Sequence, residues 1–140
     1  MATFNKYQCF VENVAEKVHN LGSDTLKVAL TNTAPTATDT VWNTTVYPAP
    51  VAANGYTAGG NTPSITSSAQ TSGTYKLVLA DTVFTATSGG IGPFRYVVLY
   101  NSTASGAVIG YYDYGSSITL ADTETFTIDF DGTNGVLTIA

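Results

Sequence analysis

The hydrophobic and polar positions of the first 22 residues repeat with the spacing of an amphipathic helix. Apolar side chains recur every three or four residues, and polar side chains fill the positions between them. The apolar members of this repeat are Phe4, Tyr7, Val11, Val14, Val18 and Leu21. The Thr3 hydroxyl can cap the first turn, and Gly22 can end the last one. The spacing predicts one helix over residues 3–21, whose apolar side covers the protein's own sheet or, alternatively, a neighbouring subunit.

From Thr25 onward the period of the pattern changes to two. Leu26, Val28 and Leu30 alternate with less apolar residues, as in a half-buried strand. Further strand patterns cover residues 64–70, 74–80, 82–87, 94–101, 107–114, 117–120, 123–130 and 136–140. Short strands at intervals of about 8–12 residues are typical of a sandwich or jelly roll. We therefore predict a mainly β fold in one domain, residues 1–140, with a jelly-roll-like antiparallel β sandwich over residues 25–140 that follows one N-terminal amphipathic α-helix.

Two stretches allow more specific predictions about the sheet. In FRYVVLYN, residues 94–101, both faces of the strand are largely apolar, which favours a central position. In TFTIDFDGTNGVLTIA, residues 125–140, glycines can supply the positive φ of a turn, so the pattern favours a hairpin between TFTIDF and VLTIA. Asp129 and Asp131 leave two alternatives open, a calcium site without the full EF-hand spacing and a glycosidase carboxylate pair.

A long loop over residues 32–63 interrupts the strand pattern. It contains four of the five prolines, an Asn-Gly pair and a Gly-Gly pair, with at most a short strand around residues 41–47. Loops longer than about 15 residues are uncommon in compact domains and are often functional. The partner-contact candidates in it are Trp42, Tyr47 and Tyr56, because aromatic side chains offer a large contact area at a low entropy cost. The alternative is that these three side chains fill the protein's own core.

The composition limits the kinds of partner. Charged residues make up 11% of the 140 residues and the net charge is −5, whereas the usual charged share is ~25%. The five Lys and Arg residues are scattered and form no cationic stripe, so we expect no nucleic-acid partner. The first 20 residues have neither a basic leader nor an unbroken apolar run, so we expect no export signal and no membrane anchor. A lightly charged surface rich in Thr, Asn and Tyr favours a packed assembly.

Few residues suggest catalytic chemistry. The G-x-S-x-G motif is absent, and the one histidine, His19, lies at the end of the predicted helix, where the helix dipole accounts for it. Cys9 is the one cysteine, which excludes an internal disulfide and a multi-cysteine metal site. The glycines of SGGIGPF, residues 88–94, lack the P-loop spacing and indicate a bend before a strand. We predict no catalytic, cofactor-binding or metal-binding residue.

A resemblance to a known family extends over almost the whole chain. It rests on the segments EKVHNLGSDTLKVALTNTAP, NGYTAGGNT, SAQTSGTYKLVLAD, IGPFRYVVLYN, YYDYGSSITL and ETFTIDFDGTNGVLTIA. These segments resemble small structural proteins of tailed bacteriophages, and the chain is similar to a capsid cement or decoration protein. The resemblance implies a non-enzymatic virion protein with a jelly-roll-like subunit, made in the host cytoplasm. It also implies a homo-oligomer, a dimer or trimer, that binds the capsid exterior and bridges neighbouring major capsid protein subunits.

Besides the glycosidase alternative, two non-enzymatic functions remain open from the residues. A phage tail or baseplate component would use a similar β sandwich. A carbohydrate-binding β-sandwich module would need aromatic rings on one exposed platform, and the candidates for such a platform are Trp42, Tyr47, Tyr56, Tyr111 and Tyr112.

Overall fold

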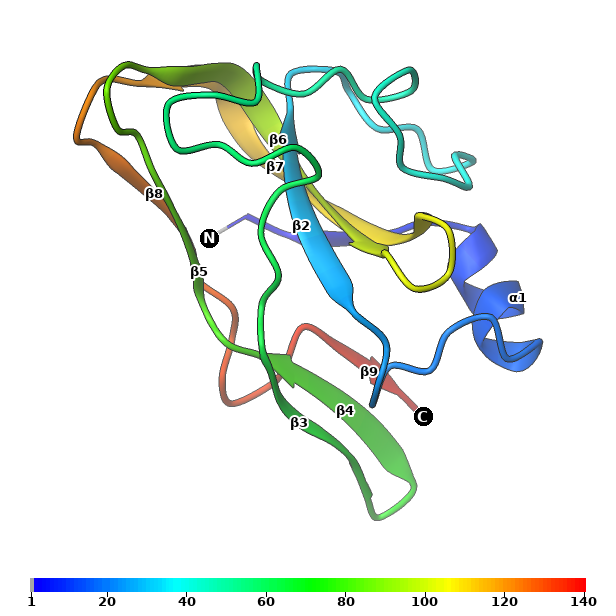
Figure 1. Ribbon diagram of the computed structural model, residues 1–140. Helices are drawn as coiled ribbons and strands as arrows, with labels where there is room; N and C mark the ends of the chain where they lie inside the picture. The colour runs from blue at the N-terminus through cyan, green and yellow to red at the C-terminus, as the bar shows by residue number, and fades with distance from the viewer. Residues whose placement is uncertain (1) are drawn as a thin grey trace.

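Antiparallel strands dominate the fold of the protein, which is described here by a computed structural model of residues 2–140. Strands hold 43% of the residues and helix holds 5%, so the predicted mainly β class is confirmed. The elements are β1 (Phe4–Lys6), α1 (Cys9–Ala15), β2 (Leu26–Thr31), β3 (Ile65–Thr71), β4 (Thr74–Leu79), β5 (Thr82–Thr85), β6 (Ile91–Asn101), β7 (Ala107–Leu120), β8 (Thr125–Ile128) and β9 (Leu137–Ile139) (Figure 1).

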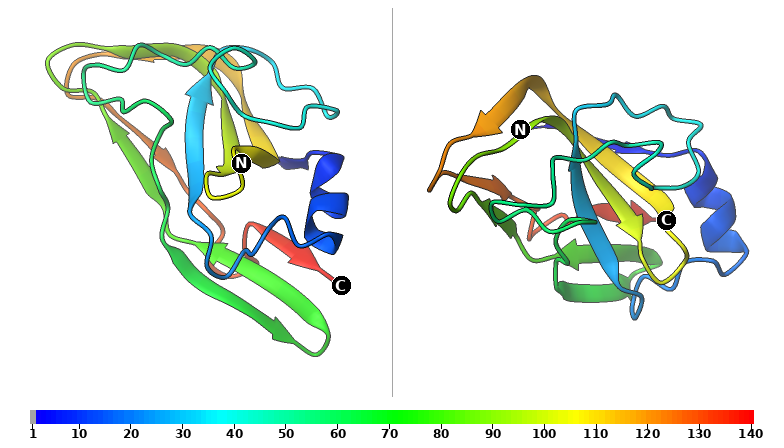
Figure 2. Two further views of the ribbon diagram at one scale, coloured as in Figure 1. Left: turned by 45° about the vertical axis from the view of Figure 1, so that its right-hand side comes forward. Right: turned by 45° about the horizontal axis from the view of Figure 1, so that its top comes forward.

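The strands form three sheets with the orders β1-β7-β6-β2, β3-β4-β9 and β5-β8. The pairs β6–β7, β5–β8 and β4–β9 are nested around the hairpin loop 102–106, so they form one long antiparallel ribbon. Two hydrogen bonds hold the ribbon at a corner between sheets: Ala86 N donates to Glu124 O, and Thr123 N donates to Ala86 O, both at 2.9 Å. The left view of Figure 2 shows the ribbon bending there. The four-stranded sheet forms one layer, and the other two sheets form a second layer that diverges from it at the corner.

The four-stranded sheet is buried on both faces where β2, the second half of β6 and the start of β7 pair. Val28, Val97 and Leu99 point into the main core between the layers, where they meet apolar side chains of β4, β5 and β8. The alternate residues Ala29 and Val98 belong to a second cluster on the outer face of the same sheet. The central position predicted for residues 94–101 is confirmed, since β6 lies between β7 and β2.

The predicted helix over residues 3–21 is wrong in its extent. Only α1 is helical, and Phe4–Lys6 forms β1 instead, which pairs with β7 through the register Phe4↔Tyr112. The Phe4 and Tyr112 rings also pack with their centroids 5.4 Å apart. A short isolated helix is only marginally stable. The backbone hydrogen bonds and ring contact offered by the edge of β7 therefore outweigh the helical periodicity of these first residues.

The helix also ends earlier than predicted. Lys17 adopts a positive φ of 64°, and its backbone N–H donates to Val14 O at 3.3 Å. The next N–H, that of Val18, donates to Asn13 O at 2.8 Å. These two bonds form a Schellman motif, which closes the helix at Lys17 and not at the predicted Gly22. Among residues 2–140, no helix has the length and hydropathy that a membrane crossing requires.

The apolar side of the N-terminal segment contributes to the protein's own core, as expected, but incompletely. Of the predicted seam, Leu21 belongs to the main core and Tyr7 to the cluster on the outer face of the four-stranded sheet. Phe10, which was not part of the predicted seam, also belongs to the main core. Val11 and Val18 remain 56% and 39% exposed, because the shortened helix turns only part of the predicted apolar seam inward.

The C-terminal hairpin prediction is wrong. The strand β8 pairs with β5 and β9 pairs with β4, so the two C-terminal strands are not partners of each other. Between the two pairings, residues 129–136 lie opposite residues 78–81, so the acidic stretch is a loop that bulges from the ribbon. The turn itself is present, since Gly135 N donates to Asp131 O at 2.8 Å.

The long loop over residues 32–63 packs against the sheets. Its predicted strand around residues 41–47 is reduced to one isolated bridge, Val41↔Ala107. The first half of the loop places Tyr47 in the outer cluster, and the second half places Tyr56 in the main core. The loop therefore serves as a cover for both faces of the four-stranded sheet.

Candidate functional site

The aromatic residues predicted as partner contacts lie largely inside the protein. Tyr47 is 1% exposed, and its hydroxyl bonds the Tyr7 hydroxyl at 3.0 Å and donates to the Asp39 carboxylate. Burial, reinforced by the bond to Asp39, raises the pKa of Tyr47 above its ordinary value. Tyr56 is 3% exposed, and its hydroxyl accepts the Leu30 N–H at 3.1 Å. Tyr47 and Tyr56 thus fill the protein's own core and present no contact surface.

Trp42 is half-buried and stacks on Tyr100, with ring centroids 4.5 Å apart and an interplanar angle of 9°. This stacking explains its place against the outer face of the sheet. The five-aromatic platform that a carbohydrate-binding module would need is not formed, because Tyr47 and Tyr56 are buried and Tyr111 packs on Tyr7.

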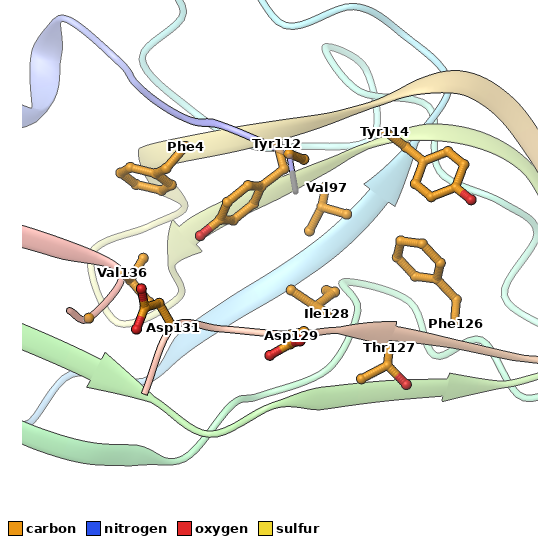
Figure 3. Close-up of a pocket in the computed structure, with 12 residues that line it drawn as sticks. Phe4, Val97, Tyr112, Tyr114, Phe126, Thr127, Ile128, Asp129, Asp131 and Val136 are labelled. Carbon is orange, nitrogen blue, oxygen red and sulfur yellow. The ribbon is translucent and has the colours of Figure 1, made fainter. Parts of the chain in front are cut away.

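A different set of side chains forms the candidate site, a cleft of about 350 Å³ between the two layers beside β1. Figure 3 shows Phe4 of β1 with Tyr112 and Tyr114 of β7 along one wall. The opposite wall consists of β8, which contributes Phe126, and of the acidic loop that follows it, which begins with Asp129. We call this feature the aromatic cleft.

The floor of the aromatic cleft is apolar. It is made by the buried side chains of Val97, Ile128 and Val136, which come from β6, β8 and the end of the acidic loop. Tyr114 and Phe126 bound one end of the cleft. Their rings pack edge to face, with the ring centroids 5.8 Å apart. The cleft therefore combines apolar depth with aromatic walls.

Tyr112 is the one partly buried hydroxyl in the wall. Burial raises the pKa of Tyr112 to about 12, so the phenol is neutral at pH 7 and can donate a hydrogen bond. In Figure 3 its hydroxyl points across the cleft toward the side that carries Val136 and Asp131.

Two carboxylates of different character stand at the rim. Asp131 accepts the Asn134 and Thr133 backbone N–H groups at 2.7 and 2.8 Å and the Asn134 side-chain amide at 2.8 Å. These bonds, led by the one from the Asn134 backbone, hold the pKa of Asp131 below its usual range, so this carboxylate is ionised and closes the loop. Asp129 is solvent-exposed and lines the cleft without such a structural role.

The carboxylates at the rim do not form the multi-carboxylate cluster that is common in calcium sites. Among residues 2–140, no group of three or more His, Cys, Asp or Glu side chains is placed to hold a metal ion. The hydrogen bonds that close the loop account for Asp131. Neither His19 nor Cys9 lines the aromatic cleft.

His19 is buried outside the aromatic cleft. The prediction that it lies at the end of a helix is wrong, because α1 ends at Ala15. Its Nδ1 lies 3.1 Å from the side-chain nitrogen of Asn101, which also donates to Asp24 at 2.7 Å. Because the Asn101 amide donates to Nδ1, the neutral ring carries its proton on Nε2, which is buried without a partner among the described residues. Burial lowers the pKa of His19, although Asp24 opposes this effect.

Acidification is therefore expected to destabilise the protein through His19. The pKa of this ring is lower in the folded than in the unfolded state, so the unfolded state binds more protons as the pH falls below about 6.5. The contribution of the neutral His19 ring to the free energy of unfolding is complete above that pH. It is lost as the pH falls from about 6.5 toward the lower pKa of the folded state. Urea unfolding should give a lower free energy of unfolding at pH 5.5 than at pH 7.5 for the wild type. The difference between the two pH values should be smaller for His19→Gln. An equal drop in both proteins would contradict this assignment, because His19 is the only histidine.

The aromatic cleft was missed by the sequence analysis, although one signal was available. Tyr112 and Tyr114 are two residues apart and so share one face of their strand. Phe126 lies opposite these two residues only because of the bend in the ribbon, and the hydrophobic pattern contains no information about that bend. No protein-family model, curated protein sequence or solved structure matches the chain. The geometry of the cleft and the sequence patterns are therefore the basis for assigning a function.

Proposed function

We propose that the chain is a structural virion protein of a tailed bacteriophage, which binds the capsid exterior and stabilises contacts between major capsid protein subunits. The aromatic cleft is the observation that carries the binding role. It offers a partner an apolar floor and aromatic walls, and its lining includes neither a histidine nor a cysteine. The family resemblance of the sequence supplies the capsid as the partner.

The architecture supports this role. One long antiparallel ribbon folded across two layers supports a jelly-roll-like subunit. The surface carries few charges, because only 11% of the residues are charged, and neutral polar side chains suit partly wet contacts between shell proteins. A homo-oligomer, a dimer or trimer, would engage several capsid subunits at once, so that modest single contacts add up through avidity.

The mechanism is thermodynamic. A protein that binds the assembled lattice but not its free subunits shifts the equilibrium toward the intact shell. The long ribbon and the doubly covered sheet keep the contact surface in one shape, which reduces the entropy cost of binding.

Capsid stability tests the proposal. Virions made without this chain should release their genome at a lower temperature than complete virions, and addition of the purified chain should restore the original temperature. Equal release temperatures with and without the chain would contradict the stabilising role. Recovery of the chain on purified tails and not on heads would favour a tail or baseplate component instead.

A further inference from the structure

We propose that the aromatic cleft receives an extended basic segment of the partner, with one Lys or Arg side chain lying over the apolar floor and its charged end beside Asp129 and Asp131. This inference deepens the proposed function and rests on it for the source of the segment, the capsid surface. The chemistry of recognition comes from the cleft itself.

The charge of the cleft selects a cation. Among the described residues, Asp129 and Asp131 are the only carboxylates that line it, and no Lys or Arg does so. Lys76 does not line the cleft, and its ammonium group donates to Thr133 O at 2.8 Å. From there its charge acts on Asp131, whereas Asp129 has no ion-pair partner among the described residues. The whole chain is also negative, with a net charge of −5. Complementary charge speeds association and disfavours partners of the wrong sign.

The depth of the cleft selects a long side chain with an apolar stem. Val97, Ile128 and Val136 form a buried apolar floor, whereas both carboxylates stand at the rim. Lys and Arg match this division, since their aliphatic stems can lie on apolar surface while the charged end stays in a polar environment. The walls add a second attraction, because a cation is stabilised over the face of a Tyr or Phe ring.

The orientation of the rings favours a peptide over a sugar. The Phe4 and Tyr112 rings are inclined at 56° to each other, and the Tyr114 and Phe126 rings at 73°. Rings at such angles enclose a narrow channel and offer no shared flat platform on which a chain of sugar rings could stack. A single flexible side chain fits such a channel better than a rigid pyranose.

Strand edges on both walls favour an extended backbone. The strand β1 is an edge strand of its sheet, and β8 pairs with β5 alone within the described residues. Each therefore has one edge without a strand partner, to which an extended segment can add backbone hydrogen bonds. Side chains alternate along an extended segment, so one basic residue can point into the cleft while its neighbours point out.

Peptide titration of the full chain tests the inference. The probes are three blocked seven-residue peptides of alternating Val and Thr whose central residue is Lys, norleucine or Glu. Norleucine keeps an aliphatic stem and removes the charge. Backbone amide shifts of the labelled protein should move at residues 112–114 and 126–131 with the Lys peptide, and binding should weaken as salt is raised.

Variants of Asp129 refine the test without disturbing the fold, because this exposed side chain does not help to close the loop. Asp129→Asn should weaken binding of the Lys peptide by about two- to fivefold, the range of an exposed charge pair, and Asp129→Lys should weaken it further. Glu16→Gln is the matched control, since it removes one exposed charge outside the cleft and should leave binding unchanged.

The outcomes separate this inference from the proposed function. Equal binding of the Lys and norleucine peptides, no binding of any peptide, or tighter binding of a neutral oligosaccharide at the same amides would overturn the basic segment as the occupant. The capsid role would survive those results if the chain still raised the release temperature of the virion. Selective binding of the Lys peptide without any effect on capsids would support the cleft chemistry and overturn the capsid role.

Discussion

Replacing Tyr56 with alanine is expected to lower the free energy of unfolding by about 3–5 kcal/mol, the usual cost of removing a large aromatic ring from a core. Tyr56 comes from the long loop but is 3% exposed in the main core. Its ring lies 5.7 Å from that of Phe84, and its hydroxyl accepts the Leu30 N–H. The substitution therefore removes ring contacts and leaves a buried backbone donor without its partner. Denaturant unfolding measures the loss.

Val51→Ala is the matched control in the same loop. Val51 is 81% exposed, so its truncation should change the free energy of unfolding by less than about 0.5 kcal/mol. If Tyr56→Ala unfolded like the wild type but lost capsid binding, Tyr56 would be a contact anchor after all, and the core role assigned to it here would be wrong.

Gly60→Ala is expected to cost at least about 3 kcal/mol. Gly60 has a φ of +80°, and a β-carbon at this position would overlap the carbonyl oxygen of Val28. That backbone cannot easily move, because Val28 and Asn61 exchange two hydrogen bonds, at 2.9 and 3.0 Å, which attach the loop to β2. The cost of a left-handed alanine, about 1–2 kcal/mol, is thus added to a backbone collision.

Gly73→Ala separates these two costs. Gly73 has a similar φ of +83°, but no atom lies within 4 Å of the position where its β-carbon would be built. It follows Ser72, which also has a positive φ, in the tight turn between β3 and β4. This variant should lose only the conformational part, about 1–2 kcal/mol. Equal losses in the two glycine variants, again by denaturant unfolding, would show that the loop attachment at Val28 is not close-packed.

The strands were predictable because alternation reports directly on which face of a strand is buried. Residues 26–30 and 74–80 each coincide with an observed strand within one or two residues. The apolar composition of both faces in residues 94–101 also indicated their central place in the sheet. These features are local, so no knowledge of the rest of the fold was required.

The errors arose where the pairing partner decides the structure. Phe4 satisfies a helical repeat, but the free edge of β7 is available to it, and the periodicity contains no information about that edge. The two C-terminal strands looked like a hairpin because they are adjacent in sequence. In the folded ribbon each finds a partner about 40 to 60 residues away, as the registers Phe84↔Phe126 and Tyr75↔Ile139 show.

The residues of the candidate site were the hardest to predict for the same reason. Trp42, Tyr47 and Tyr56 were chosen because they lie in a long loop, yet that loop covers the sheet and buries two of them. Tyr112 and Phe126 lie in ordinary strands and became a candidate site only through the bend that sets β7 opposite β8. A cleft between two layers is a property of the tertiary structure, so the shared strand face of Tyr112 and Tyr114 does not by itself indicate which residues lie opposite them.

Cryo-electron microscopy of the purified virion would show where this chain is located. We expect density for it on the outside of the capsid, over the junctions between major capsid protein subunits, with the aromatic cleft between β1 and β8 occupied by an extended segment of the shell. Density confined to the tail, or a virion without the chain, would contradict the proposed function.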